Sequence, residues 1–468
     1  MFNLPHSGMP GVVFPAVPAP AAAAMLAVLH QFRATERLPL PDLEHLQFRQ
    51  LEQLLSHASR AVPYYGPGLR AAGFIPGQPV TTELWQRLPV LSRAQVQAAG
   101  AQLHAGELPA GHGSVACATT SGSSGRPVTI QKTALFQFYW QCLTLRDQEW
   151  QARNPGATWM AILRDDQRTD PAKQPPLRRM PNWGGPMAAV YPTGPGLFLD
   201  YRAGAAELLT IIRQEQPAYL VTFPSLLREL VRESQTSGLR PQGLREVRTT
   251  GETLATGLRE LITAAWSTEE TPLRVSEIYS TAEAGIIAMP CREENALHVQ
   301  AEGVKLEILR ADGSPCQTGE EGRVVLTALH NFAMPLIRYE IGDRAVPGPA
   351  CRCGRSLPVL AAIPGRARDM LTLPDGRHRF PYYAHNAIMQ VGAIVQHQVA
   401  QTALDQVEIR LVVRRPLTPT EEAHIIGAAT QGLGGAHQVR LVYRPEIRRQ
   451  ASGKFAEFIN EFENPPAA

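Results

Sequence analysis

The sequence has little cysteine, little excess charge and no long apolar segment free of proline. Six cysteines in 468 residues are too few for a disulfide scaffold, so we expect a reducing cytoplasm. The 45 basic and 42 acidic residues leave a net charge of +3, which argues against nucleic acid as a partner. Residues 11–29 are apolar, but three prolines interrupt them and no lysine or arginine precedes them. We therefore expect neither a signal peptide nor stable membrane insertion.

Short apolar runs alternate with helical patterns between residues 155 and 330. The strand-like runs are 157–163, 218–223 and 322–329, and the helical ones are 205–214 and 225–234. This alternation predicts an α/β fold with a largely parallel sheet. Residues 303–329 contain two strand-like runs joined through the turn signal at 312–315, which predicts an added antiparallel hairpin.

The composition changes near residues 345–376, which are rich in glycine, proline and arginine. We expect an interdomain hinge there. Residues 1–364 would form a large, multi-layer α/β domain with mixed sheets, and residues 365–468 a small, mobile α+β domain. The second part has strand-like runs at 406–413 and 437–443 and a helical pattern at 418–432.

A loop rich in hydroxyl and glycine residues follows a strand-like run at 114–118. Glycines let the backbone approach phosphate oxygens, and consecutive N–H groups can form an anion-binding nest. The loop lacks the Gly-Lys-[Ser/Thr] ending of a Walker A motif, and alone it is also compatible with a plain linker. Its candidate phosphate-binding residues are Thr120, Ser121, Gly122, Ser123, Ser124 and Gly125.

Residues 120–127 resemble the phosphate-binding loop of the adenylate-forming superfamily, which includes acyl-CoA ligases, peptide-synthetase adenylation domains and luciferases. Other signatures of this superfamily follow in the same order. They are Thr250-Gly251-Glu252, Tyr279-Ser280-Thr281-Ala282-Glu283, residues 339–343, Gly365-Arg366 and Ser452-Gly453-Lys454. Within the superfamily the chain looks most like phenylacetate–CoA ligases and related capsule-biosynthesis proteins. The segments on which this likeness rests are residues 57–65, 88–96, 335–343, 351–355 and 451–455.

The resemblance implies an ATP site and a set of nucleotide-binding residues. The loop at 120–125 would bind the phosphates, and an aromatic face at Tyr279 would suit the adenine. The carboxylate of Asp343 would hold the ribose hydroxyls. The residues implied for adenine and ribose are Gly251, Glu252, Tyr279, Ser280, Asp343 and Arg366.

The resemblance also implies the residues that carry the chemistry. Glu283 would hold Mg²⁺, which needs hard oxygen ligands. Lys454 would bridge the acid and the α-phosphate and steady the charge as pyrophosphate leaves. Arg368 would be the hinge residue, although the family usually has an aspartate at that place. Ala282 departs from the family too, because it replaces a hydroxyl residue beside Glu283. Thr281 takes over that role only if one residue is looped out.

Cys291, His298, Cys351 and Cys353 form a second constellation. Three thiolates and one imidazole can complete a tetrahedral zinc site with no open position, which is typical of structural zinc. The Cys-x-Cys spacing is tighter than the common one, so ordinary buried thiols are the alternative. The resemblance favours zinc, because phenylacetate–CoA ligase-like proteins often carry such residues at these places.

The sequence therefore predicts an enzyme that activates a carboxylic acid, aryl or arylacetic, as an acyl-adenylate and transfers the acyl group to CoA. One alternative is an adenylating enzyme whose acceptor is an amine or a separate carrier protein. Another is a nucleotide-binding protein without catalysis, for which the altered segment 279–283 is the best argument. A homodimer is left open.

Overall fold

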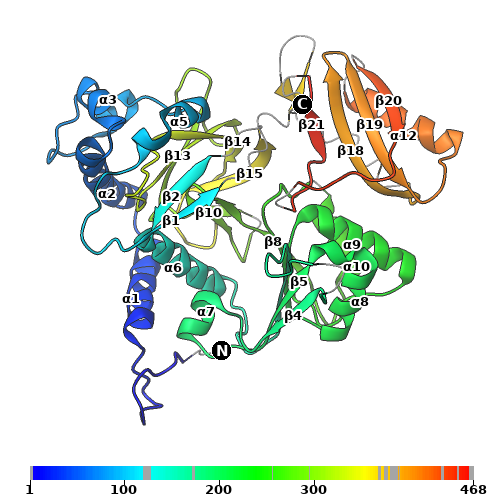
Figure 1. Cartoon of the computed structure of the whole chain (residues 1–468), viewed down its shortest axis with the longest axis horizontal. Coiled ribbons are helices and arrows are strands. Elements are labelled where there is room, and N and C mark those ends of the chain that lie inside the picture. Colours follow the sequence, from blue (N-terminus) through cyan, green and yellow to red (C-terminus); the bar gives the residue numbers. More distant parts are fainter. Residues whose placement is uncertain are drawn as a thin grey trace. The chain divides into compact units, whose positions relative to one another are not determined.

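The computed structural model divides the chain into two compact units, each assembled from separate stretches (Figure 1). It describes residues 4–119, 128–170, 174–255, 257–294, 296–366, 370–373, 378–379, 388, 391–433, 437–450 and 453–462. Unit 1 comprises residues 1–156, 184–193 and 278–364, and unit 2 comprises residues 157–183, 194–277 and 365–468. Among the described residues, no helix combines the length and apolar character needed to cross a membrane. The predicted α/β class with mixed sheets is confirmed.

Unit 1 is built on a sheet with the strand order β12-β13-β14-β15-β11-β10-β9. Its strands are β9 (Tyr279–Thr281), β10 (Gly285–Pro290), β11 (Leu297–Val299), β12 (Val304–Leu309), β13 (Gly322–Ala328), β14 (Tyr339–Pro347) and β15 (Val359–Arg366). The predicted hairpin at 303–329 is confirmed, because β12 and β13 pair antiparallel with Val304 opposite Ala328. A separate antiparallel pair joins β1 (Val115–Thr119) to β2 (Thr129–Thr133).

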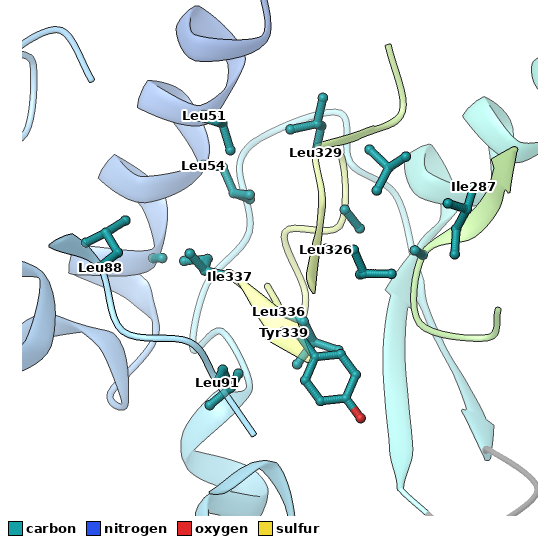
Figure 2. Packing of buried hydrophobic residues seen from close by; sticks show 14 of the residues in the cluster. Leu51, Leu54, Leu88, Leu91, Ile287, Leu326, Leu329, Leu336, Ile337 and Tyr339 are labelled. Atoms are coloured by element: carbon teal, nitrogen blue, oxygen red, sulfur yellow. The ribbon is translucent and has the colours of Figure 1, made fainter. Parts of the chain in front are cut away.

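Helices of unit 1 share one hydrophobic core with this sheet. They are α2 (Leu40–Ala61), α3 (Tyr65–Ala71), α4 (Thr82–Arg87), α5 (Arg93–Ala99), η1 (Gly100–Leu103) and α6 (Ala134–Trp150). Unit 1 also contains α1 (Pro20–Thr35) and α7 (Gly185–Val190), whose buried residues lie outside this core. Leu51 and Leu54 of α2 lie one turn apart, so they share one face of the helix. Figure 2 shows both pointing toward the side of the core that holds Leu329 and Ile337.

Unit 2 contains a sheet with the order β4-β5-β3-β6-β7-β8, parallel except for β4. Its strands are β3 (Trp159–Leu163), β4 (Leu177–Met180), β5 (Gly196–Asp200), β6 (Tyr219–Thr222), β7 (Glu246–Thr249) and β8 (Arg274–Glu277). The helical segments are η2 (Tyr201–Ala203), α8 (Ala205–Glu215), α9 (Pro224–Ser237) and α10 (Leu258–Trp266). Figure 1 shows α8, α9 and α10 gathered on one face, where their apolar residues join the sheet in one core.

The run at 322–329 does not belong to this parallel sheet. It forms β13 of unit 1, between β12 and β14. The short turn signal before it explains the difference, because a short connection joins antiparallel neighbours, whereas parallel strands need a longer crossover.

The last part of unit 2 is a sheet with the order β20-β19-β18-β21 and one helix packed on it. The elements are β16 (Leu371–Thr372), β17 (His378–Arg379), β18 (Ile394–Ala403), β19 (Gln406–Val413), α12 (Pro419–Gly432), β20 (Gln438–Tyr443) and β21 (Phe458–Asn460). A capping box between Thr418 and Glu421 begins α12. Whether residues 365–468 move as a separate domain stays a prediction.

Candidate active site

Loops of unit 2 meet at the edge of the sheet where the parallel strands end. Tyr201 follows β5, Phe223 follows β6 and Gly251 comes two residues after β7. Carboxyl ends of parallel strands share one edge, so these loops are neighbours. The rings of Tyr201 and Phe223 meet edge to face with centroids 6.3 Å apart. Because β3 lies between β5 and β6, these rings flank the point where the strand order reverses, which is the usual ligand crevice of such sheets.

Lys454 lies at this edge on a closely packed loop. Its neighbour Gly453 has φ +86°, and a Cβ atom there would lie 2.7 Å from Cε1 of Tyr201 and 3.3 Å from Cε2 of Phe223. A Cβ atom on Gly251, which has φ +78°, would lie 3.1 Å from Cε of Lys454. Both positions therefore need glycine for conformation and for space. The structure thus brings together the sequence-predicted residues Gly251 and Lys454.

The Glu252 carboxylate is tied to the same loop. Its Oε1 accepts hydrogen bonds from the backbone N–H of Phe455 at 2.6 Å and from the Ser225 hydroxyl at 3.0 Å. Its Oε2 accepts one from the Ser225 backbone N–H at 3.0 Å. Arg449 adds positive charge, with Nη1 3.8 Å from Oε1 of Glu252. Burial raises the pKa of Glu252, while the hydrogen bonds and Arg449 act in the opposite direction.

Sequence reasoning missed Ser225 and Arg449. Ser225 stands in the first turn of α9, and its hydroxyl accepts a hydrogen bond from Nη1 of Arg449 at 2.8 Å. Neither residue belongs to a recognisable motif. The nearest signal is that Arg449 precedes the Ser452-Gly453-Lys454 signature closely, which does not indicate what it contacts.

Unit 1 brings together two other sequence-predicted residues, Tyr279 and Asp343. Tyr279 begins β9 and Asp343 lies in β14. The Tyr279 hydroxyl donates a hydrogen bond to Oδ2 of Asp343 at 2.7 Å, and both residues are buried. This contact orients the carboxylate.

Glu283 lies buried in the turn between β9 and β10, after the half-buried Ser280. The Thr281 hydroxyl accepts a hydrogen bond from the Ala284 backbone N–H at 3.2 Å. The negative charge of Glu283 acts on buried Lys132 of β2, opposing the burial that lowers the pKa of Lys132. Aromatic rings of α6 surround this amine, with Nζ 5.1 Å from the ring centre of Trp140. Sequence reasoning did not identify Lys132 either.

Several predicted residues lie outside the described part of the chain. They are Thr120, Ser121, Gly122, Ser123, Ser124 and Gly125 of the phosphate loop and the hinge residue Arg368. The loop connects β1 to β2, whose ends Thr119 and Thr129 are paired. Arg366 is the last residue of β15 and is half-buried.

The predicted metal ligands of unit 1 converge. Cys291 follows β10, His298 lies in β11, and Cys351 and Cys353 lie between β14 and β15. The possible ligand atoms of all four residues lie within 4.8 Å of one another. Pairing of β10, β11 and β15 in one sheet is what brings these distant sequence positions together.

The spacing of these atoms can be compared with a zinc site. Ligand atoms of a tetrahedral Zn²⁺ bound by sulfur and nitrogen are about 3.5–3.8 Å apart. The Sγ atoms of Cys291 and Cys351 are 3.6 Å apart, and Sγ of Cys353 is 3.3 Å from Nε2 of His298. The donor set therefore fits zinc, and these two spacings lie within about 0.2 Å of the expected range.

The sequence of the chain is similar to known proteins over part of its length. No family model matches the chain. Over 216 residues it is 27% identical to the phenylacetate–coenzyme A ligase of Thermus thermophilus, covering 44% of this chain and 47% of that protein. It is 26% identical to the Pseudomonas putida enzyme of the same name over 223 residues, again 44% and 47% of the two chains. The chain thus matches about half the length of these relatives.

Solved structures share the fold over most of the chain. A 2-hydroxyisobutyryl-CoA ligase in the postadenylation state, in complex with 2-HIB-AMP, has a TM-score of 0.71 at 20% identity, covering 91% of each chain. An anthranilate–CoA ligase in complex with anthranoyl-AMP has a TM-score of 0.54 at 14% identity, covering 87% of this chain and 79% of the other. At such identities the likeness concerns the fold.

Proposed function

We propose that this chain belongs to the adenylate-forming superfamily, activates a carboxylic acid with ATP and then transfers the acyl group to CoA. Its sequence similarity and its fold support this proposal. The observation that carries the proposal is the Lys454 loop, seated at the carboxyl edge of the parallel sheet against Gly251. This is the edge at which α/β sheets bind ligands. A lysine held there is suited to an anionic reaction centre, because its charge can balance phosphate and carboxylate oxygens.

The nucleotide would be held by groups of different chemistry. The loop at 120–125 binds the phosphates, and Tyr279 and Asp343 bind adenine and ribose. The contact between the Tyr279 hydroxyl and Asp343 supports this role, because it orients the carboxylate in advance. Gly251, Glu252, Ser280 and Arg366 complete the proposed nucleotide set. Mg²⁺ would be held by Glu283, whose carboxylate is a suitable hard ligand.

The first reaction joins the acid to AMP. A carboxylate oxygen of the acid attacks the α-phosphorus, the bond to the bridging oxygen of the β-phosphate breaks, and pyrophosphate leaves. Lys454 steadies the charge that develops during this exchange. The thiol of CoA then attacks the acyl carbon, forming a thioester and releasing AMP and a proton. Movement of residues 365–468 about Arg368 would separate the two steps.

The acid is proposed to be aryl or arylacetic. Relatives named for phenylacetate and a structural neighbour named for anthranilate favour this class. A cytoplasmic location remains our expectation from the low cysteine content.

Zinc is the metal proposed for Cys291, His298, Cys351 and Cys353. Three thiolates and one imidazole would satisfy it fully, so it would stabilise the fold of unit 1 and take no part in the reaction.

The test is pyrophosphate release with Mg-ATP across aryl, arylacetic, fatty and amino acids, each with and without CoA. Release that requires one acid class, together with the matching CoA thioester, is the expected result. Release without any thioester would replace CoA with an amine or a separate carrier protein as the acceptor. ATP binding without release for any acid would replace the enzyme with a nucleotide-binding protein.

A further inference from the structure

The Lys454 loop is held by the carboxylate of Glu252, a residue to which the proposed function assigns only nucleotide binding. Oε1 of Glu252 accepts the backbone N–H of Phe455, the residue directly after Lys454, at 2.6 Å. Only 10% of the Glu252 side chain is exposed. A hydrogen bond to a charged group in such surroundings is stronger than one between neutral groups.

Glu252 is itself held firmly by α9. The backbone N–H and the hydroxyl of Ser225 donate to its two oxygens, both at 3.0 Å. Arg449 bridges from the other side, since its Nη1 donates to the Ser225 hydroxyl at 2.8 Å and to the Gly453 carbonyl at 3.2 Å. Glu252 thus connects the start of α9 to Phe455 on one side of Lys454, and Arg449 connects it to Gly453 on the other.

Backbone hydrogen bonds also join the described residues on the two sides of this loop. The Gln450 backbone N–H donates to the Lys454 carbonyl at 2.9 Å, and the Gly453 N–H donates to the Gln450 carbonyl at 2.8 Å. These bonds join residues of the loop to one another and do not connect the loop to the sheet edge. The contact with Glu252 makes this connection, because it joins Phe455 to a residue in the loop that follows β7.

We propose that Glu252 is a positioning residue for Lys454, which latches the lysine loop to the carboxyl edge of the parallel sheet. The effect of this contact on the reaction rests on the proposed function, whereas the contact between Glu252 and the Lys454 loop does not. Only the step that needs Lys454 depends on it. Formation of the acyl-adenylate therefore requires the latch, whereas attack of CoA on a supplied acyl-adenylate does not.

Other ion pairs join α9 to the C-terminal part of unit 2 without touching this loop. Arg414 contacts Glu233 at 3.2 Å and the Thr236 hydroxyl at 3.0 Å. Glu233 has the same charge as Glu252 and lies on the same helix as Ser225. Glu233→Gln is therefore a matched control: it removes a carboxylate that joins α9 to the C-terminal part of unit 2, but it leaves the contacts of the Lys454 loop in place.

The first measurement needs no substrate. Amide hydrogen exchange of residues 453–458 is compared in the full-length wild type, Glu252→Gln, Glu252→Ala and Glu233→Gln. Exchange in this segment should rise roughly 10- to 100-fold in Glu252→Ala, the range set by losing a hydrogen bond to a charged group, and less in Glu252→Gln. Glu233→Gln should leave it unchanged. Unchanged exchange in Glu252→Ala would overturn the latch whatever the activity of the protein.

The second measurement separates the half-reactions. Pyrophosphate release should fall roughly 10- to 100-fold in kcat for Glu252→Ala, while thioester formation from supplied acyl-adenylate and CoA stays within about twofold. An equal fall in both half-reactions would overturn the positioning role. A rise in the dissociation constant of ATP that matches the fall in rate would also overturn it, because Glu252 would then act through nucleotide binding alone. If wild type releases no pyrophosphate with any acid, the proposed function fails, and the exchange experiment still decides whether the latch exists.

Discussion

Replacing Gly453 by alanine tests the packing of the lysine loop most directly. At φ +86° an alanine would adopt the left-handed region, which costs about 1–2 kcal/mol. Its Cβ atom would also lie 2.7 Å from Cε1 of Tyr201 and 3.3 Å from Cε2 of Phe223, and such overpacking costs about 1–3 kcal/mol. Together these terms disfavour the observed position of Lys454 by about 2–5 kcal/mol. If adenylation needs that position, its rate should fall roughly 30- to 5,000-fold.

The assay is pyrophosphate release at saturating ATP and acid, with ATP binding measured separately. Gly427→Ala is the matched control, because this exposed glycine lies in α12 with no atom near the new Cβ. It should change the rate by less than about twofold, since alanine favours a helix. ATP should bind Gly453→Ala as tightly as wild type.

A second variant divides the two causes. Tyr201→Ala removes the nearest ring, so the double variant with Gly453→Ala should recover at least about tenfold relative to Gly453→Ala, once the effect of Tyr201→Ala alone is subtracted. The conformational cost should remain. Activity of Gly453→Ala within about threefold of wild type would refute the reasoning, because the loop would then not need its observed geometry.

The remaining predictions concern the lysine, the metal site and the fold of unit 1. Lys454→Ala should abolish pyrophosphate release almost completely while ATP binding persists in a titration; equal activity would remove Lys454 from the mechanism. Purified wild type should contain about one zinc per chain by elemental analysis, and Cys353→Ser should lose most of it; a zinc-free wild type would contradict the site. Glu302→Gln should lower the free energy of unfolding by about 3 kcal/mol in denaturant titrations at pH 7. Arg146, only 1% exposed, then loses the nearer of its two carboxylate partners, at 2.6 Å, and keeps only Glu36 at 3.6 Å. Burial raises the pKa of Glu302, but Arg146 and Thr35 together outweigh it and hold that pKa below its usual range. The difference between Glu302→Gln and wild type should therefore be complete above about pH 4.3 and shrink as the pH falls further; a constant difference would contradict the pairing.

Much of the secondary structure could be predicted from local pattern. The runs at 157–163 and 218–223 became β3 and β6, and the helical patterns at 205–214 and 225–234 became α8 and α9. These predictions succeeded because hydrophobic periodicity and turn residues act over a few neighbouring positions. The run at 322–329 has a similar pattern but lies in another sheet, because pairing partners depend on connections that the run itself does not contain.

The candidate residues were predictable as types but not as contacts. The signature around Lys454 is visible in the sequence, and so are the four metal-ligand candidates. The four metal-ligand candidates converge only because β10, β11 and β15 pair in one sheet. Ser225 and Arg449 carry no motif, and their importance arises only from meeting Glu252 in space.

The sequence alone indicated the α/β class, several of the helices and strands, and a resemblance to the adenylate-forming superfamily, since these depend on local periodicity and on short motifs in a fixed order. Tertiary structure decided which separate segments meet. It set Gly453 against Tyr201, joined Glu252 to Phe455, and brought Cys291 to Cys351 across 60 positions of the chain. The physical reason is that burial and hydrogen bonding between distant residues depend on the whole arrangement of strands and helices, which no local stretch of sequence contains.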